Sequence, residues 1–340
     1  MKYDNQVSNF DLNIFSKMWF TSQVKNNMLL YPGFIIYPDN ISKSQQHDNN
    51  FHFVQKINWR QLENRPKNVK LIVCFGNSAL KEEYLSERER ITFHIQEHFN
   101  MDEYIVLNLG VSGYTIYEQM LLYNALVYPL KPEFVISIGI GTDWRVSLVS
   151  CKEMMITHKM IYTTPTWENA TKISLKSNLP LLYENGSSER CIDNSISDED
   201  INTAIVTRIE QFKNIVESNG GVFICYLQAL LPFKKKQTQK EQYYNQLGTI
   251  NGYGQTYINT IKDKRVFNLA KSLNEMMRER TYFYDLNQVI ANEEKHIFDY
   301  WIHCNPYGNK LVANFIAEKI KERIKEKETL TTQKKCNFIA

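Results

Sequence analysis

The sequence has no long hydrophobic run. Apolar stretches such as Phe34 to Ile36 and Phe134 to Ile138 are far shorter than the roughly 18 residues that a membrane-spanning helix needs. The first residues also lack the apolar core of a secretion signal. We therefore expect a cytoplasmic protein without a membrane partner.

An excess of one charge is also absent. Lys and Arg number 40 and Asp and Glu number 37, which leaves a formal net charge of only +3. Nucleic-acid-binding domains usually carry a strong basic field, so a nucleic-acid partner is not expected. Hydrophobic residues make up 43% of the 340 residues and charged residues 23%. These proportions are those of a globular protein and exclude a disordered or fibrous chain.

Cysteines are few and widely spaced. The six cysteines stand at positions 74, 151, 191, 225, 304 and 336, without a C-x-x-C pair. Small disulfide scaffolds and zinc modules need denser and more regular spacing. We expect reduced thiols and no bound metal or cofactor.

Buried strands alternate with helices along much of the chain. The β-branched apolar runs predict strands over residues 69–75, 104–109, 133–138, 222–227 and 281–286. Helical patterns cover about 81–99, 115–128, 198–219 and 260–280, with a last helix after residue 305. Such alternation predicts a five-stranded parallel sheet with right-handed crossovers, in a three-layer α/β/α, flavodoxin-like fold.

The remaining segments suggest additions to one α/β domain. Residues 1–66 precede the first core strand and are predicted to wrap the domain, which spans 67–325. The polar, aperiodic stretch of about 145–197 is interpreted as an insertion that could form a lid. Residues 326–340 are predicted to be a mobile tail.

Glycine, serine and histidine cluster where these strands end. Ser78 follows the first strand, and His303 precedes the last helix. In parallel sheets, ligands bind beyond the carboxyl ends of the strands. A serine, a histidine that takes its proton and a carboxylate that orients the histidine form the arrangement used for acyl transfer.

These loops resemble the sequence blocks of the SGNH (GDSL-like) hydrolases. The matching blocks read CFGNSAL, VLNLGVSGYT, SIGIGTDW and HCNPYGNKLVANFIAEKI. The stretches GYTIYEQMLLYNALVYPLKPEFVIS and YLQALLPFKKKQTQKEQYY resemble a subgroup of large SGNH proteins. The resemblance covers about 69–145 and 220–322. It implies a serine esterase or O-acyltransferase with the three-layer fold predicted above.

The resemblance also implies residue roles. Ser78 would be the nucleophile, and His303 would be the general base and then the general acid. The N–H groups of Ser78 and Gly113 would bind the oxyanion, together with the Thr142 hydroxyl. Three further residues would shape the site, namely Asn77, Asp143 and Gln228.

Two positions depart from the family pattern. Thr142 stands where the family has an asparagine whose amide donates to the oxyanion, and a threonine hydroxyl reaches less far. The family spaces its carboxylate and histidine as Asp-x-x-His, whereas Asp299 and His303 are one residue further apart and Tyr300 fills the expected place. Asp299 is the candidate orienting carboxylate. A Ser-His dyad oriented by a backbone carbonyl is the alternative.

Structural explanations compete with these roles. Ser78 could simply cap the next helix, His303 could be a packed core histidine, and Gly113 could serve backbone geometry alone. Asp143 could cap the segment after the third strand. The basic turn Lys234–Lys236 could steer an anionic substrate, but a solvated loop is the default interpretation.

Two other motifs are weaker. His94 and His98 match the H-x-x-E-H pattern of inverted zinc proteases, without an evident third ligand, so a solvated helix face is the preferred interpretation. The Gly139-x-Gly141 pair lacks the third glycine of a dinucleotide fingerprint. Cys304 has no separate base for a thiol mechanism.

The sequence therefore predicts a serine-dependent ester hydrolase or O-acyltransferase that works through an acyl-enzyme on Ser78. From the resemblance, the substrate would be an acylated carbohydrate or a small metabolite. A catalytically impaired binding protein of the same fold is the alternative, supported by the two departures. The acyl group, the alcohol and the oligomeric state do not follow from the sequence.

Overall fold

The computed structural model describes residues 29–31, 34–36, 57–111, 113–149, 197–247 and 265–337. Its centre is a five-stranded sheet in the order β4-β3-β5-β6-β7, with every neighbouring pair parallel. These strands span Tyr104–Gly110, Lys70–Gly76, Phe134–Gly139, Val222–Leu227 and Phe283–Asp285, respectively. The order corresponds to 2-1-3-4-5, which is the flavodoxin-like order. The predicted fold class is confirmed.

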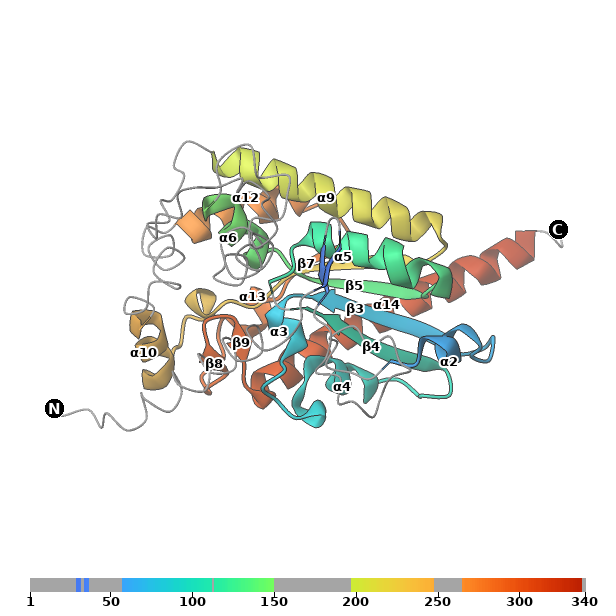
Figure 1. Cartoon of the computed structure of the whole chain (residues 1–340), viewed down its shortest axis with the longest axis horizontal. Helices are drawn as coiled ribbons and strands as arrows, with labels where there is room; N and C mark the ends of the chain where they lie inside the picture. Colours follow the sequence, from blue (N-terminus) through green and yellow to red (C-terminus); the bar gives the residue numbers. More distant parts are fainter. Residues whose placement is uncertain are drawn as a thin grey trace, which may run out of the picture.

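Helices cover both faces of the sheet (Figure 1). On one face lie α5 (Ile116–Leu122), α9 (Asp198–Ser218) and α12 (Arg265–Met277). On the other lie α4 (Ile91–Gln96) and α14 (Pro306–Asn337). Both faces of the central strands are therefore shielded from water, which explains why these strands are continuous apolar runs and do not alternate with polar residues.

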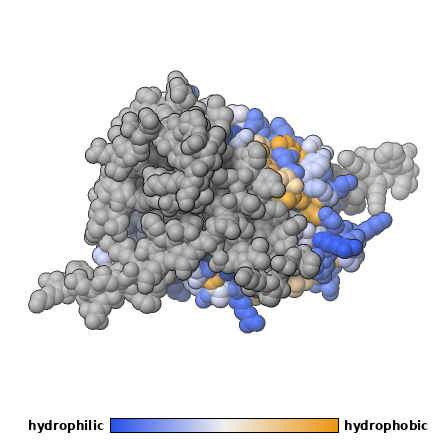
Figure 2. All heavy atoms as spheres, in the orientation of Figure 1, coloured by the Kyte–Doolittle hydropathy of each residue, from blue (hydrophilic) through white to orange (hydrophobic). Residues whose placement is uncertain are grey.

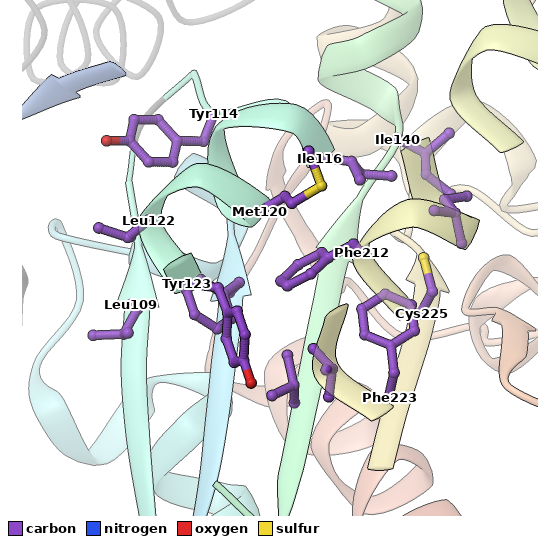
Figure 3. Close-up of a cluster of buried hydrophobic side chains, with 14 of the residues drawn as sticks. Leu109, Tyr114, Ile116, Met120, Leu122, Tyr123, Ile140, Phe212, Phe223 and Cys225 are labelled. Atoms are coloured by element: carbon purple, nitrogen blue, oxygen red, sulfur yellow. The ribbon is translucent and has the colours of Figure 1, made fainter. Parts of the chain in front are cut away.

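The core of the first face forms around aromatic side chains (Figure 3). Phe212 of α9 is fully buried and meets the rings of Phe75, Tyr123 and Phe223 at centroid distances of 5.8, 5.6 and 5.0 Å. Edge-to-face and tilted ring pairs at such distances stabilise a core beyond their burial alone. This packing fixes α5 and α9 against the strands whose ends carry the candidate site.

Helix α9 begins and ends where the sequence predicts. Ser197 is its N-cap, and its Oγ accepts a hydrogen bond of 3.0 Å from the Asp200 N–H. Ile201, Ile205, Ile209, Phe212 and Val216 are buried along one stripe of this helix. Gly220 has φ +85°, the left-handed conformation that glycine adopts without strain just after a helix.

The helix predicted over 81–99 is wrong as a single element. The short helix α3 (Ser78–Lys81) ends at Glu82, which has φ +48°. A new start follows at Ser86, whose capping box with Glu89 opens the 3-10 helix η1 (Glu87–Glu89) before α4. Local hydrogen bonding of a serine and a glutamate three residues apart thus divides a segment whose charge pattern alone reads as one helix.

The smaller elements complete the described chain. The helices are α2 (Trp59–Glu63), α6 (Gly141–Val149), α10 (Gln239–Leu247) and α13 (Asn287–Ile290). Helix α5 passes into a π-helical turn, η2 (Tyr123–Val127), and 3-10 turns lie at η3 (Tyr128–Leu130) and η6 (Leu231–Phe233). Two antiparallel pairs join β1 (Leu29–Tyr31) to β2 (Phe34–Ile36) and β8 (Phe298–Tyr300) to β9 (His303–Cys304).

The predicted division of the chain stays a prediction. The greater part of the N-terminal wrap and of the 145–197 insertion lies outside the described residues. Helix α14 runs to Asn337, so most of the predicted tail is helical. Within the described ranges, no helix has the length and apolar character to cross a membrane. Where described residues are visible in Figure 2, hydrophilic side chains surround small hydrophobic areas.

Candidate active site

Ser78 and His303 meet beyond the carboxyl ends of the central strands. Ser78 is the first residue of α3, directly after β3, and His303 begins β9. These two elements lie side by side (Figure 1). The Ser78 Oγ is 3.4 Å from His303 Nε2, although the residues are 225 positions apart in the chain. The fold therefore brings together the two residues that the sequence predicts as nucleophile and base.

Close backbone packing aims Ser78 at this edge. Gly76 ends β3, and a Cβ there would lie 2.7 Å from the Cβ of Leu80 and 2.9 Å from the Ile138 oxygen. Only glycine fits such an approach. The turn into α3 can therefore be sharp, and it leaves Ser78 half-buried at the start of the helix.

His303 is nearly enclosed, with 5% of its surface exposed. Burial lowers its pKa to about 4, while the charge of Asp299 acts in the opposite direction. The ring of Tyr84 meets the imidazole edge-on at 5.4 Å, and the ring of Tyr300 lies 6.4 Å away at 30°. The imidazole is therefore neutral near pH 7, which is the state that can accept a proton from Ser78.

Asn77 connects the nucleophile turn to the start of α6 and to the loop after β6. Its Oδ1 accepts from the Ala79 N–H at 2.9 Å and so caps α3. Its Nδ2 donates to Thr142 Oγ1 at 2.8 Å and to Gln228 Oε1 at 2.5 Å. Asn77 and Gln228 are both buried. Two of the three residues predicted to shape the site, Asn77 and Gln228, therefore share one hydrogen-bond network next to Ser78, and their role in shaping the site stays a prediction.

In this network the Thr142 hydroxyl is a hydrogen-bond acceptor. Thr142 lies in the first turn of α6 and is 8% exposed. Across the part of the chain that the structure describes, its hydroxyl makes one hydrogen bond, in which the oxygen accepts from Asn77. Among these residues the hydroxyl proton has no acceptor, so it is placed to be donated to a bound ligand. Ile140, two residues earlier, has φ +78°, a strained conformation for a β-branched residue.

Gly113 and Asp143 define the neighbouring loop. Gly113 has φ +82°, so the backbone geometry alone favours glycine there, and its role as an oxyanion donor stays a prediction. Asp143 accepts hydrogen bonds from the Ile116 N–H at 3.1 and 3.3 Å, at the start of α5. Burial raises its pKa to about 7, against the opposing charge of Arg208. Asp143 therefore anchors the start of α5, next to the loop that carries Gly113.

Asp299 contacts a different histidine. Its Oδ1 lies 3.3 Å from His296 Nε2 and 3.5 Å from Lys240 Nζ. Burial raises the pKa of this carboxyl, but the His296 hydrogen bond and the Lys240 charge outweigh that effect and leave the pKa below its usual value. The negative charge of Asp299 also acts on His303, whose pKa it raises against the effect of burial. Its predicted role as the orienting carboxylate stays a prediction.

The competing motifs do not form a second centre. His94 Nδ1 contacts Glu97 at 2.9 Å, whereas His98 Nε2 contacts Asn314 at 2.9 Å. Among the described residues, no group of three or more His, Cys, Asp or Glu side chains is arranged to hold a metal ion. Burial raises the pKa of the Cys304 thiol well above its usual value, so a thiolate is not formed readily beside His303.

The interpretation of the basic turn is wrong for Lys234. Lys234, assigned to a solvated turn, is 1% exposed and pairs with the buried Glu241 at 2.5 Å. A composition argument treats three consecutive lysines alike, but only the tertiary contacts distinguish them. Thr238-x-x-Glu241 is a capping-box pattern that marks the start of a helix, but it does not indicate that Lys234 is buried.

Comparison with known proteins gives structural matches only. No family model matches the chain, and no curated protein matches significantly. A proposed acylhydrolase of Bacteroides fragilis is 14% identical, covers 78% of this chain and 94% of its own, and has a TM-score of 0.43. A GDSL-like lipase of Bacteroides thetaiotaomicron is 12% identical over 79% of this chain and 98% of its own, with a TM-score of 0.38.

A lipase/acylhydrolase of Enterococcus faecalis is 14% identical over 75% of this chain and 96% of its own, with a TM-score of 0.39. These similarities concern the fold, and the chemistry must be argued from the residues of this chain.

Proposed function

We propose that this protein transfers acyl groups from ester substrates through a covalent intermediate on Ser78. The observation that carries the proposal is the 3.4 Å approach of Ser78 Oγ to a buried His303 Nε2. A weak nucleophile such as serine needs an adjacent base, and a neutral imidazole at this distance fits that need.

The mechanism has two halves. In the first, Ser78 Oγ attacks the ester carbonyl carbon while its proton moves to His303 Nε2. The tetrahedral intermediate then collapses, the bond to the alcohol breaks, and His303 returns the proton to the leaving oxygen. In the second half, water or another hydroxyl attacks the acyl-serine and releases the acyl group by the same proton transfers.

The negative charge of the tetrahedral intermediate needs hydrogen-bond donors fixed in advance. The Ser78 N–H stands at the first position of a helix, where no intrahelical acceptor exists. The Thr142 hydroxyl is held from behind by Asn77 and can donate its own proton. Gly113 would add a third donor from the loop anchored by Asp143. These three groups are the proposed oxyanion site.

The substrate class follows from the sequence resemblance and is also part of the proposal. It is an acylated carbohydrate or a small metabolite ester. Water as acceptor makes the protein an esterase, and a sugar or metabolite hydroxyl makes it an acyltransferase. Both reactions use the same residues, and the exclusion of water from the acyl-enzyme decides between them.

The test compares the wild type with Ser78→Ala on a short-chain p-nitrophenyl ester. We expect hydrolysis by the wild type and background rates from the variant. A fluorophosphonate should label the wild type, with the label on Ser78 in peptide mass spectrometry. Equal rates for both proteins, or no hydrolysis and no labelling by a folded wild type, would contradict the proposal. Either result would favour the catalytically impaired binding protein.

A further inference from the structure

A buried ion pair lies next to the hairpin formed by β8 and β9, which carries His303. Lys234 Nζ and Glu241 Oε2 are 2.5 Å apart, and both side chains have 0% exposure. Fully buried Lys and Glu are rare unless they are paired, and such a pair often adds little net stability. Neither residue touches Ser78 or His303 in the contacts described above. The position of this ion pair in the fold therefore calls for an explanation other than stability.

Glu241 binds groups from three segments. Its Oε2 accepts from Lys234 and from the Thr238 N–H and hydroxyl at 2.8 and 3.1 Å, which caps α10. Its Oε1 accepts from the Ile297 and Phe298 N–H groups at 2.9 and 3.2 Å. Lys234 Nζ also donates to the Lys295 oxygen at 2.6 Å. His296 Nδ1 lies 3.9 Å from Glu241 Oε1.

The backbone held by Glu241 leads directly into the catalytic hairpin. Phe298 begins β8, and Tyr300 pairs with His303 across the turn. The Ile297 oxygen accepts from the Asn305 N–H at 2.8 Å, just beyond His303. Both ends of the hairpin are therefore fixed at Ile297. A shift of this residue would move His303 relative to Ser78.

We propose that the Lys234–Glu241 pair is a positioning device that sets the distance between His303 and Ser78. Glu241 acts through the Ile297–Phe298 backbone, and Lys234 keeps the Glu241 carboxylate charged and directed toward that backbone. The two residues are positioning residues and do not touch the reacting atoms. This inference rests on the proposed function for its kinetic consequence, but its structural consequence can be measured without any activity.

The pKa of Glu241 agrees with this arrangement. Burial alone would raise it, but the hydrogen bond from Lys234 and those from the backbone outweigh burial and keep it below the usual value. The carboxylate therefore stays ionised and accepts all its hydrogen bonds at neutral pH. The other titratable groups facing it are His296, which lies on the hairpin side, and Lys234.

The chain offers a matched control. Lys236 and Glu294 also form an ion pair of 2.5 Å, and they lie only two and one positions from Lys234 and Lys295. Their side chains are 55% and 74% exposed, unlike the buried pair. Exposed pairs contribute little to stability. Glu294→Gln therefore removes the same charge from a neighbouring pair without loosening the hairpin.

The test measures Glu241→Gln, Glu241→Asp and Glu294→Gln on the p-nitrophenyl ester and by NMR of histidine-labelled protein. Glu241→Gln replaces one carboxylate oxygen by an amide donor, which must face either the Lys234 and Thr238 donors or the Ile297 and Phe298 N–H groups, so the contacts that hold the hairpin are disrupted. Glu241→Asp keeps the charge but shortens the reach to Ile297 and Phe298, so it tests the same contact if the first variant does not fold. We expect kcat to fall about 10- to 100-fold with KM changed less than about twofold, because misplacement by about 1 Å costs roughly that much.

The NMR measurement does not depend on esterase activity. In both Glu241 variants the pKa of His303 should rise from about 4 toward its ordinary value of 6.5, because water gains access to the imidazole. Glu294→Gln should leave kcat and this pKa unchanged. A Glu241 variant that loses stability but keeps the wild-type kcat and His303 pKa would overturn the proposal. A wild type without esterase activity would overturn the proposed function. The His303 titration would still test whether the Lys234–Glu241 pair positions His303.

Discussion

Replacing Thr142 by valine tests whether a threonine can serve in the oxyanion site. Valine keeps the branched shape of threonine and replaces only the hydroxyl, by a methyl group. In the structure this hydroxyl accepts one hydrogen bond, from Asn77 Nδ2 at 2.8 Å. The substitution therefore removes an acceptor for Asn77 and the proposed donor for the substrate oxyanion, and leaves the backbone of α6 in place.

The two losses have different sizes. One buried Asn77 proton without an acceptor costs about 1–3 kcal/mol of folding free energy. Loss of one oxyanion donor lowers kcat by about 10²–10³, or roughly 3–4 kcal/mol of transition-state stabilisation. Because a threonine hydroxyl reaches less far than an asparagine amide, we expect the lower end, a fall of about 100-fold in kcat.

Thr142→Ser is the matched control, since serine keeps the hydroxyl and its bond to Asn77. The assay is steady-state hydrolysis of the p-nitrophenyl ester, with the free energy of unfolding measured by denaturant for each variant. We expect Thr142→Val to lose kcat with little change in KM, and Thr142→Ser to stay within about tenfold of the wild type. Equal kcat in Thr142→Val and the wild type, with both folded, would refute the role of the hydroxyl.

Further predictions concern the histidine, its acidic neighbour and the nucleophile turn. Because burial lowers the pKa of His303 to about 4, kcat/KM should fall on the acid side near pH 4, and a limb near pH 6.5 would contradict this. The unfolded chain takes up this proton first, so the contribution of His303 to the free energy of unfolding should decrease as the pH falls from about 6.5 to 4, and His303→Gln should remove that contribution when the two proteins are compared in denaturant titrations. Asp299→Asn should lower kcat less than about tenfold, because the contacts of its Oδ1 are to His296 and Lys240, and a loss above 1000-fold would instead identify a triad carboxylate. Gly76→Ala should lower the melting temperature and the labelling rate of Ser78, because the new Cβ would lie 2.7 Å from a carbon of Leu80, and an unchanged melting temperature would show that the turn can relax.

The strands show how much of the fold the local sequence can predict. Lys70–Gly76, Tyr104–Gly110 and Phe134–Gly139 lie close to their predicted ranges because a strand buried on both faces must be apolar throughout. The segment after Ser78 is different. A charge pattern suggested one helix there, but Glu82 in a left-handed conformation and the cap at Ser86 divide it.

The sequence also predicted the meeting of Ser78 and His303, because Ser78 follows a parallel strand at the edge where ligands bind and His303 precedes the last helix. It did not predict how these residues are held. Asn77 bonds to Thr142 and Gln228, which are 65 and 151 residues away, and spacing along the chain contains no information on such a bond. The environment of Asp299 was equally hidden, since its contact with Lys240 depends on where α10 packs.

Periodicity and strand-end chemistry thus determined the sheet, its layers and the pairing of serine with histidine, because these depend on which residues must be buried and on which edge the strands end. Only the tertiary structure decided that Lys234 is buried while Lys236 is exposed, and that Asp299 pairs with His296. Charged side chains carry no periodic signature of burial, so their partners emerge only when distant segments pack together.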